Sequence, residues 1–501
     1  MWKTRLLIIF FALFVFGIFF YKALYFLDPD FGWHLKMGEI IISQKGVPQT
    51  DPFSYTMSNF AFIDHEWLTN ATIALLYKKF GVWALSLMYI SIAFSALFIS
   101  ITNPISREST KGKINILKMI IPAVLGISLM QPFFGIRPQV ESWLLLAVFL
   151  RLFMNAKNWN KWRFITPLFV IFWTNLHGSF PLSLFTMAIV LIGRSWRKRK
   201  VNKTDILIFV ISVIATGVNP YGFRIWNEIW QQMSDGSLRW TIQEWRPAIF
   251  FTSFSFIAFL PLFTALIWRY RKNFLIEEKL LILFFLVQGL SSTRHLPLLL
   301  VVSLPWACKS IEYLYLEVVK LIKGGERFLM VGKVTLFLLL LILMNESVGS
   351  IALTKIFTET KYYPGSAINY LTTQSPAGNI FSEYAWGGYL IWKFPEKKVF
   401  IDGRMPSWKD ENGYKPMDDY VGILTGKTNY KPIFEKFEIN TVLWPKDRNI
   451  MKKTGGVYLM VNAIAKRIGV NTNGFSFTQK LLEDGWKIIY EDETSEVYSR
   501  I

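Results

Sequence analysis

Residues 28–34 read DPDFGWH and residues 64–69 read DHEWLT, and both motifs lie in a polar stretch between two hydrophobic segments. The stretch places two of the chain's four histidines beside Asp28, Asp30, Asp51, Asp64 and Glu66. Two interpretations fit this density of acid and imidazole: a polar reaction site held at a membrane surface, or an ordinary charged loop. The rest of the sequence decides between them.

The composition is that of a multi-span membrane protein. Of the 501 residues, 52% are hydrophobic and 17% are aromatic, and the mean hydropathy is +0.32. Several apolar runs approach the ~20 residues that cross a bilayer. The net charge is +20, and the basic residues lie in short loops between these runs, as the positive-inside rule expects. The charge therefore does not predict a nucleic-acid partner. A single cysteine, Cys308, excludes a disulfide framework and a cysteine-based metal site.

Alternation of apolar segments with basic loops predicts about eleven spans, with the N-terminus inside and the C-terminus outside. The first segment, Leu6 to Leu27, follows Lys3 and Arg5 and is interpreted as an uncleaved anchor rather than a signal peptide. Short spans fit helices packed around a water-filled cavity. The further segments are expected at residues 82–101, 120–134, 140–154, 164–175, 180–192, 206–218, 254–268, 280–290, 296–306 and 334–344.

The same alternation divides the chain into a transmembrane domain, residues 1–350, and an external α/β domain, residues 351–501. The acidic first external loop covers residues 28–70, with an amphipathic helix at 31–44 expected to lie on the membrane and a second helix beginning at Asp64. In the external domain, helices are predicted at 367–373, 417–424, 432–437 and 477–484. A mixed sheet is predicted from the strands NIFS, GYLIWKF, KVFIDGR, NTVLWP, WKIIYED and EVYSRI.

The polar motifs share one side of this predicted topology. The motifs DPDFGWH, DHEW, GIRPQ, NLHG, NPYG, EWRP and STRH all fall on the external face, and the basic loops fall on the other. All four histidines, His34, His65, His177 and His295, lie in these motifs. Ionisable residues at the ends of membrane helices usually mark a site, so the pattern favours a functional external face.

The acids of the first loop also have structural explanations. Asp28 or Asp30 could cap the helix that follows, and Asp28 fits this better because a proline follows it. Asp51, in TDPF, is interpreted as a turn former. Asp64 could cap the next helix and Glu66 would then lie in its first turn, where negative charge is favourable.

The other motifs leave similar alternatives open. Arg137 could either extend to lipid headgroups or bind a phosphate, and His177 could simply pack in its tight link. Arg294 and His295 follow a polar SST at a helix end, which favours function. In FIDGR, a salt bridge between Asp402 and Arg404 that fixes a turn is favoured over a catalytic role. A last sequence feature, a belt of interfacial aromatic residues, is expected at Trp226, Trp230, Trp240 and Trp245.

The chemistry that fits is group transfer from a lipid phosphate. The sequence has no glycine-rich phosphate loop, no HExxH and no nucleophile elbow, which argues against a nucleotide-driven enzyme. A carboxylate could deprotonate an acceptor hydroxyl. Arginine, histidine or a divalent cation such as Mg²⁺ or Mn²⁺ bound by carboxylates could neutralise the leaving phosphate. A lipid-linked donor is already activated, so no nucleotide is needed outside the cell.

The chain resembles the GT-C superfamily of integral-membrane glycosyltransferases. The resemblance rests on the acidic loop after the first span, its amphipathic helices, the number of spans and the C-terminal external domain. More narrowly, DPDFGWHLKMGE, VPQTDPFSYT, DHEW, RPQ, NLHG, NPYG, EWRP, GGYLIW and VFIDGR together resemble a group of bacterial GT-C-like membrane proteins. The resemblance implies a polyprenyl-phosphate sugar donor, a plasma-membrane location, a glycan, lipid or protein acceptor, and inversion at the anomeric carbon.

The resemblance also implies residue roles. Asp30 is the expected base and Asp28 its nearest rival, whereas Asp64 and Glu66 are the expected metal ligands and match the family's second acidic position only loosely. The residues expected around the substrate and its phosphate are His34, His65, Arg137, His177, Arg294 and His295. Two other functions remain open: a transporter or flippase of a lipid-linked or anionic substrate, and a non-catalytic protein of envelope assembly. A transporter would be expected to show inverted repeats and charges at the bilayer midplane, and the sequence shows no repeat.

Overall fold

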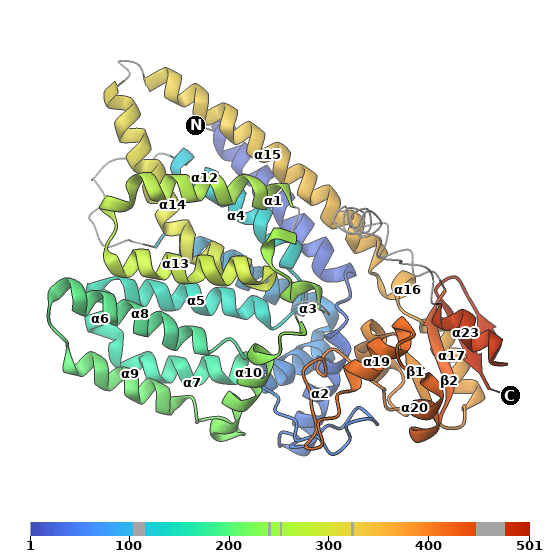
Figure 1. Ribbon diagram of the computed structural model, residues 1–501. Coiled ribbons are helices and arrows are strands. Elements are labelled where there is room, and N and C mark those ends of the chain that lie inside the picture. Colours follow the sequence, from blue (N-terminus) through green and yellow to red (C-terminus); the bar gives the residue numbers. More distant parts are fainter. Residues whose placement is uncertain are drawn as a thin grey trace. The chain divides into compact units, whose positions relative to one another are not determined.

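A computed structural model describes residues 2–103, 116–238, 242–250, 253–321, 325–446 and 476–500 (Figure 1). The chain forms two compact units. The first unit comprises Met1–Leu24, Val82–Ile225 and Arg239–Leu353, and the second comprises Tyr25–Gly81, Trp226–Leu238 and Thr354–Ile501. The acidic loop predicted at 28–70 therefore lies in the same compact unit as the C-terminal segment.

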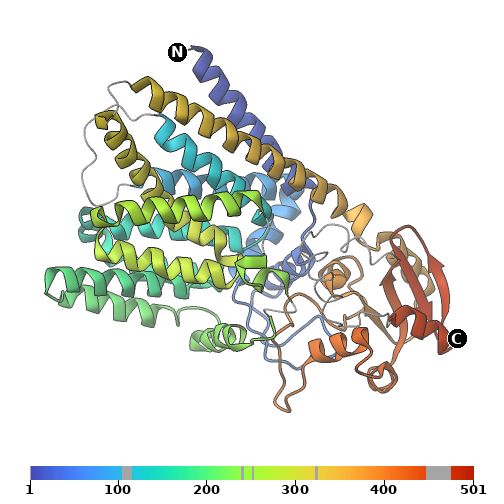
Figure 2. The ribbon, with the colours of Figure 1, turned by 45° about the horizontal axis from the view of Figure 1, so that its top comes forward.

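The first unit is a bundle of helices. Each of the predicted apolar segments lies in a helix, and neighbouring helices such as α8 and α13, or α13 and α14, pack side by side (Figures 1 and 2). The helices are α1 (Trp2–Tyr25), the second half of α3 (Trp67–Ile101), α4 (Ile116–Met130), α5 (Gln139–Met154), α6 (Ala156–Trp162), α7 (Thr166–Leu176), α8 (Pro181–Lys198), α9 (Lys203–Ala215), α12 (Phe254–Tyr270), α13 (Ile276–Ser291), α14 (Leu296–Leu321) and α15 (Gly325–Ile356).

A buried lysine ties the first helix to the bundle. The Lys22 Nζ atom donates to the carbonyl oxygens of Gln131, at 2.7 Å, and Pro132, at 3.1 Å. These carbonyls lie where α4 ends and a short 3₁₀ turn, Gln131–Phe133, begins. The last carbonyls of a helix lack partners within the helix, so a cation stabilises them. The lysine thus satisfies a helix end inside the bundle.

Three described helices are long and apolar enough to cross a membrane: Trp67–Ile101, Thr293–Val318 and Met330–Ile356. A fourth span results if Gln139–Met154 and Lys157–Leu176, which meet at a bend of 101°, count as one broken span. Two shorter apolar helices cover Ile9–Tyr25 and Met119–Phe133. The predicted number of spans and their orientation stay predictions.

The second unit joins the first loop to a small α/β fold. Helix α2 covers Phe31–Gln44, the length expected from its periodicity, and α3 begins at Trp67, three residues after the predicted start at Asp64. The axis of α3 breaks at Gly81, whose φ of 68° a residue with a Cβ would rarely adopt. The remaining helices are α10 (Ile225–Ser234), α16 (Glu359–Tyr362), α17 (Gly365–Gln374), α18 (Gly387–Lys393), α19 (Pro416–Thr425), α20 (Tyr430–Lys436) and α23 (Phe477–Glu483).

The sheet of this unit is mixed, as predicted. Its strands are β1 (Asn379–Ser382), β2 (Ile439–Pro445), β3 (Lys487–Glu491) and β4 (Ser495–Ser499), in the order β1-β2-β4-β3. Strands β1 and β2 are parallel, and the β2–β4 and β3–β4 pairs are antiparallel. The fully buried Phe381 on β1 stacks against Trp444 on β2, so one face of the sheet supplies the core.

Two predicted strands are wrong. GYLIWKF, residues 388–394, lies mostly in helix α18, and KVFIDGR forms only an isolated bridge between Val399 and Ser54. An apolar run of about seven residues is compatible with a strand or a helix, so its periodicity cannot decide between them. The helix packs closely on α2. A methyl group at Gly32 of α2 would overlap the carbonyl oxygen of Gly388 in α18.

The membrane contact predicted for α2 stays a prediction. Its buried side chains, which include Trp33, His34, Leu35 and Met37, pack within the second unit, and α18 is a neighbour. The predicted aromatic belt also stays untested. Trp230 on α10 is 75% exposed, whereas Trp240 lies outside the described residues.

Candidate functional site

The two acids of DPDFGWH have different environments. Asp28 is buried, and its Oδ1 atom accepts the Asp30 backbone N–H at 3.0 Å while its carbonyl accepts the Phe31 N–H at 3.1 Å. Asp30 occupies the cap position of α2, but its side chain makes no capping bond. Instead its Oδ1 atom accepts the Trp33 Nε1–H at 3.1 Å, and the residue remains partly exposed. Asp28 therefore holds the turn, whereas Asp30 is only partly buried.

A hydrogen-bonded chain links DHEW to α2. The Asn70 Nδ2 atom donates to both carboxylate oxygens of Asp64, at 3.0 and 2.8 Å, and Asn70 Oδ1 lies 2.6 Å from His34 Nδ1. The Asn70 amide nitrogen faces the Asp64 carboxylate, so the Asn70 amide oxygen faces the His34 ring. That oxygen can only accept, so His34 must carry a hydrogen on Nδ1. Asp64 Oδ1 also accepts the Glu66 backbone N–H at 3.0 Å, which closes a turn just before α3. The helix begins only at Trp67, so the predicted capping of a helix from His65 is wrong.

Glu66 lies between two histidines. Its Oε2 atom is 3.8 Å from His34 Nδ1, and its Oε1 atom is 3.7 Å from His65 Nε2. A further acid, Glu228 of α10, is buried, and burial raises the pKa of its carboxyl while the nearby His65 lowers it. Glu228 was missed by sequence reasoning, because it is a single acid in an amphipathic segment without a motif.

Burial shifts the titration of Asp64 in particular. Removal of the carboxyl from water raises the pKa of Asp64 to about 7, against the lowering effect of the Asn70 hydrogen bond, while the charge of Glu66 adds to the rise. Arg404 lowers the same pKa by its positive charge. The carboxyl of Asp64 thus stays protonated to a higher pH than the carboxyl of an exposed aspartate.

Arg404 of FIDGR forms a buried ion cluster with two acids. Its Nε and Nη2 atoms bind Asp402 at 2.8 and 2.6 Å, and its Nη1 atom lies 2.8 Å from Asp51 Oδ1. The predicted salt bridge between Asp402 and Arg404 is confirmed. The predicted turn at Asp51 is also confirmed, because its carboxylate accepts the N–H groups of Phe53 and Ser54 at 3.1 and 2.9 Å.

A second polar group lies in the first unit, where three predicted motifs meet. Arg137 of GIRPQ forms an ion pair with Glu244 of EWRP. The charge of Arg294, in STRH, also acts on the carboxylate of Glu244. The Arg294 guanidinium carbon lies 5.5 Å from the centre of the Trp245 ring. Burial acts to raise the pKa of Glu244, but the two arginines outweigh it, so the pKa lies below its usual value.

Backbone contacts hold these motifs together. The hydroxyls of Ser292 and Thr293 donate to the Glu244 carbonyl oxygen at 3.0 and 2.9 Å. The rings of Trp245 and His295 meet edge to face, with centroids 6.3 Å apart. The structure thus brings Arg137, Arg294 and His295 to one region of the first unit.

His177 has a structural environment. Its Nδ1 atom lies 2.8 Å from the hydroxyls of both Ser142, in the first turn of α5, and Ser179. Trp173 Nε1 donates to the same Ser179 hydroxyl at 3.0 Å. These bonds fix the NLHG link between α7 and α8. They agree with the packing role left open by the sequence.

The predicted metal site is not supported by the donor set. Among the described residues, no group of three or more His, Cys, Asp or Glu side chains is arranged to hold a metal ion. Asp64 instead directs both carboxylate oxygens at Asn70. Asp64 and Glu66 as metal ligands therefore stay a proposal from the sequence.

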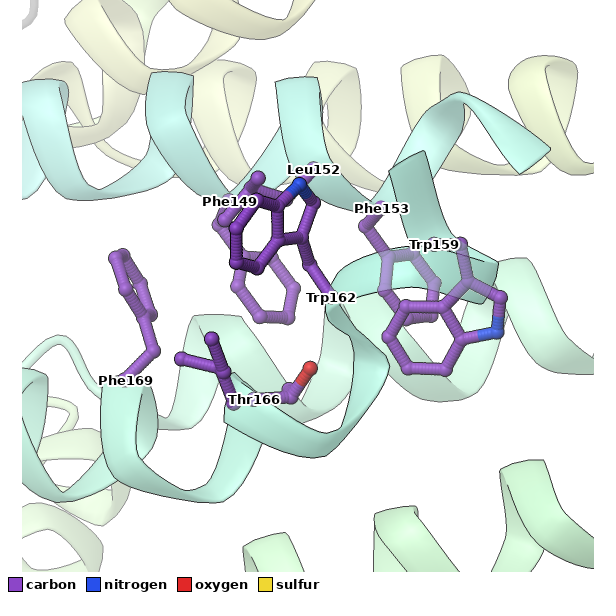
Figure 3. A pocket seen from close by; sticks show the side chains of 8 residues that line it. Phe149, Leu152, Phe153, Trp159, Trp162, Thr166 and Phe169 are labelled. Carbon is purple, nitrogen blue, oxygen red and sulfur yellow. The ribbon is translucent and has the colours of Figure 1, made fainter. Parts of the chain in front are cut away.

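An apolar cavity of about 270 Å³ lies in the first unit at the bend between α5 and α7 (Figure 3). Its lining residues are Phe149, Leu152, Phe153, Trp159, Trp162, Ile165, Thr166 and Phe169. Thr166 is the one hydroxyl residue of this lining, and none of the lining residues is charged. The cavity therefore lacks the groups that would bind a phosphate or activate a hydroxyl.

Solved structures of two membrane enzymes share this fold. ArnT from Cupriavidus metallidurans, bound to undecaprenyl phosphate, aligns over 99% of this chain and 98% of its own, with a TM-score of 0.54 and 10% identity. The archaeal oligosaccharyltransferase AglB from Archaeoglobus fulgidus, in complex with an inhibitory peptide and a dolichol-phosphate, aligns over 84% of this chain with a TM-score of 0.54 and 11% identity. Both are GT-C membrane glycosyltransferases.

The chain has the GT-C fold. The fold expected from the sequence motifs is thereby confirmed, and the GT-C fold is one of integral membrane proteins. This GT-C chain spans 66% of the length of the archaeal enzyme and nearly the whole of ArnT. No protein-family model and no curated protein matches its sequence. At such low identity the likeness establishes the GT-C fold and leaves the reaction to be argued from the residues.

Proposed function

We propose that this protein transfers a sugar from a polyprenyl-phosphate donor to a hydroxyl of an external glycan, lipid or protein. The observation that carries the proposal is Asp30. It is a partly exposed carboxylate at the start of α2, held by Trp33, in the first loop of a GT-C fold. The solved structures of the fold include complexes with undecaprenyl phosphate and dolichol-phosphate. The donor class of this protein is inferred from that chemistry.

Asp30 serves as the general base in this proposal. Its carboxylate takes the proton of the acceptor hydroxyl as the hydroxyl oxygen bonds to the anomeric carbon. The bond between that carbon and the phosphate oxygen breaks, and the polyprenyl phosphate leaves with the bonding electrons. Asp28 is the weaker candidate, because its carboxylate is buried and already accepts the Asp30 backbone N–H. Attack from the face opposite the phosphate gives inversion.

The arginines of the first unit supply the positive charge that a lipid phosphate needs. Arg137 and Arg294 share one carboxylate, Glu244, so the group keeps a net positive charge that can bind phosphate oxygens. His295, beside Trp245, belongs to the same proposed phosphate-binding group. His177 supports the helices around it through its hydrogen bond to Ser142 of α5. In the second unit, His34 and His65 flank Glu66 and are proposed to contact the sugar or the acceptor.

The membrane orientation in this proposal is the one predicted from the basic loops. The N-terminus lies inside, and the C-terminal domain lies outside the plasma membrane, where lipid-linked sugars are delivered. A divalent cation such as Mg²⁺ or Mn²⁺ at Asp64 and Glu66 stays a proposal from the sequence. Transfer rates measured with and without a chelator of divalent cations test it.

The test compares Asp30→Asn with Asp28→Asn in membranes supplied with a panel of radiolabelled polyprenyl-phosphate sugars. Asp30→Asn removes the proton acceptor and should lower transfer by at least ~100-fold. Asp28→Asn keeps an oxygen that can accept the Asp30 N–H, so transfer should persist within about tenfold. Equal amounts of folded protein, measured by gel filtration in detergent, are the control. Full activity of Asp30→Asn would refute the assignment of the base.

A further inference from the structure

The segment IDGR of the C-terminal region contacts the catalytic loop directly. A methyl group added at Gly403 would overlap the Asp30 Oδ1 atom. Gly403 has no left-handed backbone conformation, so its φ permits an alanine, but the added methyl group would displace the Asp30 carboxylate. The missing side chain thus makes room for the carboxylate of Asp30.

The next residue, Arg404, supports the same carboxylate from another side. Its guanidinium carbon lies 5.9 Å from the centre of the Trp33 ring, and the Trp33 Nε1–H is the donor that Asp30 Oδ1 accepts. Asp402 and Asp51 fix the guanidinium by hydrogen bonds and charge. The rings of Phe53, Phe62 and Trp408 also lie within 5.1 Å of it. The guanidinium is therefore fixed by two acids and surrounded by aromatic rings, of which the Trp33 indole is one.

We propose that Gly403 and Arg404 are positioning residues, which fix the Asp30 carboxylate at the start of α2. Gly403 leaves space for the Asp30 Oδ1 atom. Arg404 lies beside the Trp33 indole, which donates a hydrogen bond to that atom. An effect of Gly403 and Arg404 on the transfer rate rests on the proposed function of Asp30. Their contact with Asp30 does not depend on that function. Misplacement of a reacting group by about 1 Å can cost about a hundredfold in rate. A segment more than 300 residues from Asp30 in the sequence would thus set the rate of transfer.

The first test is a double-mutant cycle that needs no substrate. Gly403→Ala is expected to lower the melting temperature of the full-length protein in detergent by several degrees. In an Asp30→Ala background the carboxylate is gone, so the same change should cost clearly less. Gly46→Ala is the matched control, because the nearest heavy atom to its added methyl group is 3.8 Å away. Equal losses in both backgrounds would overturn the contact.

The second test measures transfer, with the donor that is active in the panel above. Gly403→Ala should lower kcat by at least about tenfold and leave KM for the donor within twofold, because positioning and not binding is lost. Arg404→Lys keeps the charge and should retain more activity than Arg404→Met. A fall in donor affinity alone, or equal activity of the two Arg404 variants, would overturn the positioning role.

The two tests separate the two proposals. Coupling in the cycle together with no transfer by the wild type from any donor would leave the contact intact and count against the proposed function. Transfer by the wild type without coupling in the cycle would support the function and refute the positioning by Gly403.

Discussion

At the residue scale, burial decides how the acids of the second unit behave. Asp28, Asp51, Asp64 and Asp402 are nearly inaccessible, and each accepts backbone or side-chain hydrogens. Asp30 is more exposed than these four. The sequence does not distinguish these five aspartates. The fold buries four of them as structural carboxylates and leaves Asp30 as the candidate base.

The free energy of unfolding should depend on pH through the titration of Asp64. Burial raises its folded pKa to about 7 from 3.8, and about three units correspond to about 4 kcal/mol at most. The folded protein keeps a proton that the unfolded chain releases, so this contribution falls from about pH 4 to about pH 7 and is constant above. In Asp64→Asn this part of the pH dependence should disappear.

Melting temperatures in detergent between pH 4 and 8 measure this effect. The difference between wild type and Asp64→Asn is expected to change with pH, in favour of the variant as the pH rises. Glu493→Gln, which removes an exposed carboxylate, should run parallel to the wild type. A pH-independent difference for Asp64→Asn would show that its carboxyl titrates as in water.

At the element scale, glycines let α2 and α18 approach closely. A methyl group at Gly32 would overlap the Gly388 carbonyl oxygen, and one at Gly388 would overlap the carbonyl oxygen of Pro29. The glycines of DPDFGWH and GGYLIW, which belong to separate motifs, thus form one packing contact. This contact lies between two helices, so it belongs to the helical form of residues 387–393 and not to the predicted strand.

Gly32→Ala should therefore destabilise the protein by about 1–3 kcal/mol or more, because the helices must separate. The measurements are the melting temperature and the fraction of monodisperse protein after extraction from membranes. Gly46→Ala, just beyond the end of α2, makes only an ordinary contact at 3.8 Å and should behave as the wild type. A neutral Gly32→Ala would indicate that α2 and α18 do not pack through these glycines.

At the scale of the whole molecule, the predicted orientation can be tested with cysteines. The chain has one cysteine, Cys308, so Cys308→Ser supplies a background without thiols. Glu435→Cys, on α20, should react with a membrane-impermeant maleimide in intact cells. Lys200→Cys, in the basic loop after α8, should react only after the membrane is permeabilised. The opposite labelling pattern would invert the topology and remove the external reaction from consideration.

Much of the fold follows from local sequence signals. Apolar runs predict the helices of the first unit, and the periodicity of residues 31–44 predicts α2, because burial of one helix face repeats every few residues. The strands NIFS and NTVLWP are recognised by the same local logic. Short runs such as 388–394 are too short for periodicity to decide, and there the packing partner decides.

The sequence by itself determined that the chain is a membrane helical protein with a mixed α/β segment and a cluster of acids after the first helix. It also singled out Asp30, Arg137 and Arg294 as residues of interest. Only the tertiary structure decided which acid stays accessible, that Glu244 pairs with Arg137, and that Gly403 lies against Asp30. The physical reason is that burial, ion pairing and close contact depend on residues far apart in the chain, which the sequence pattern around each residue does not contain.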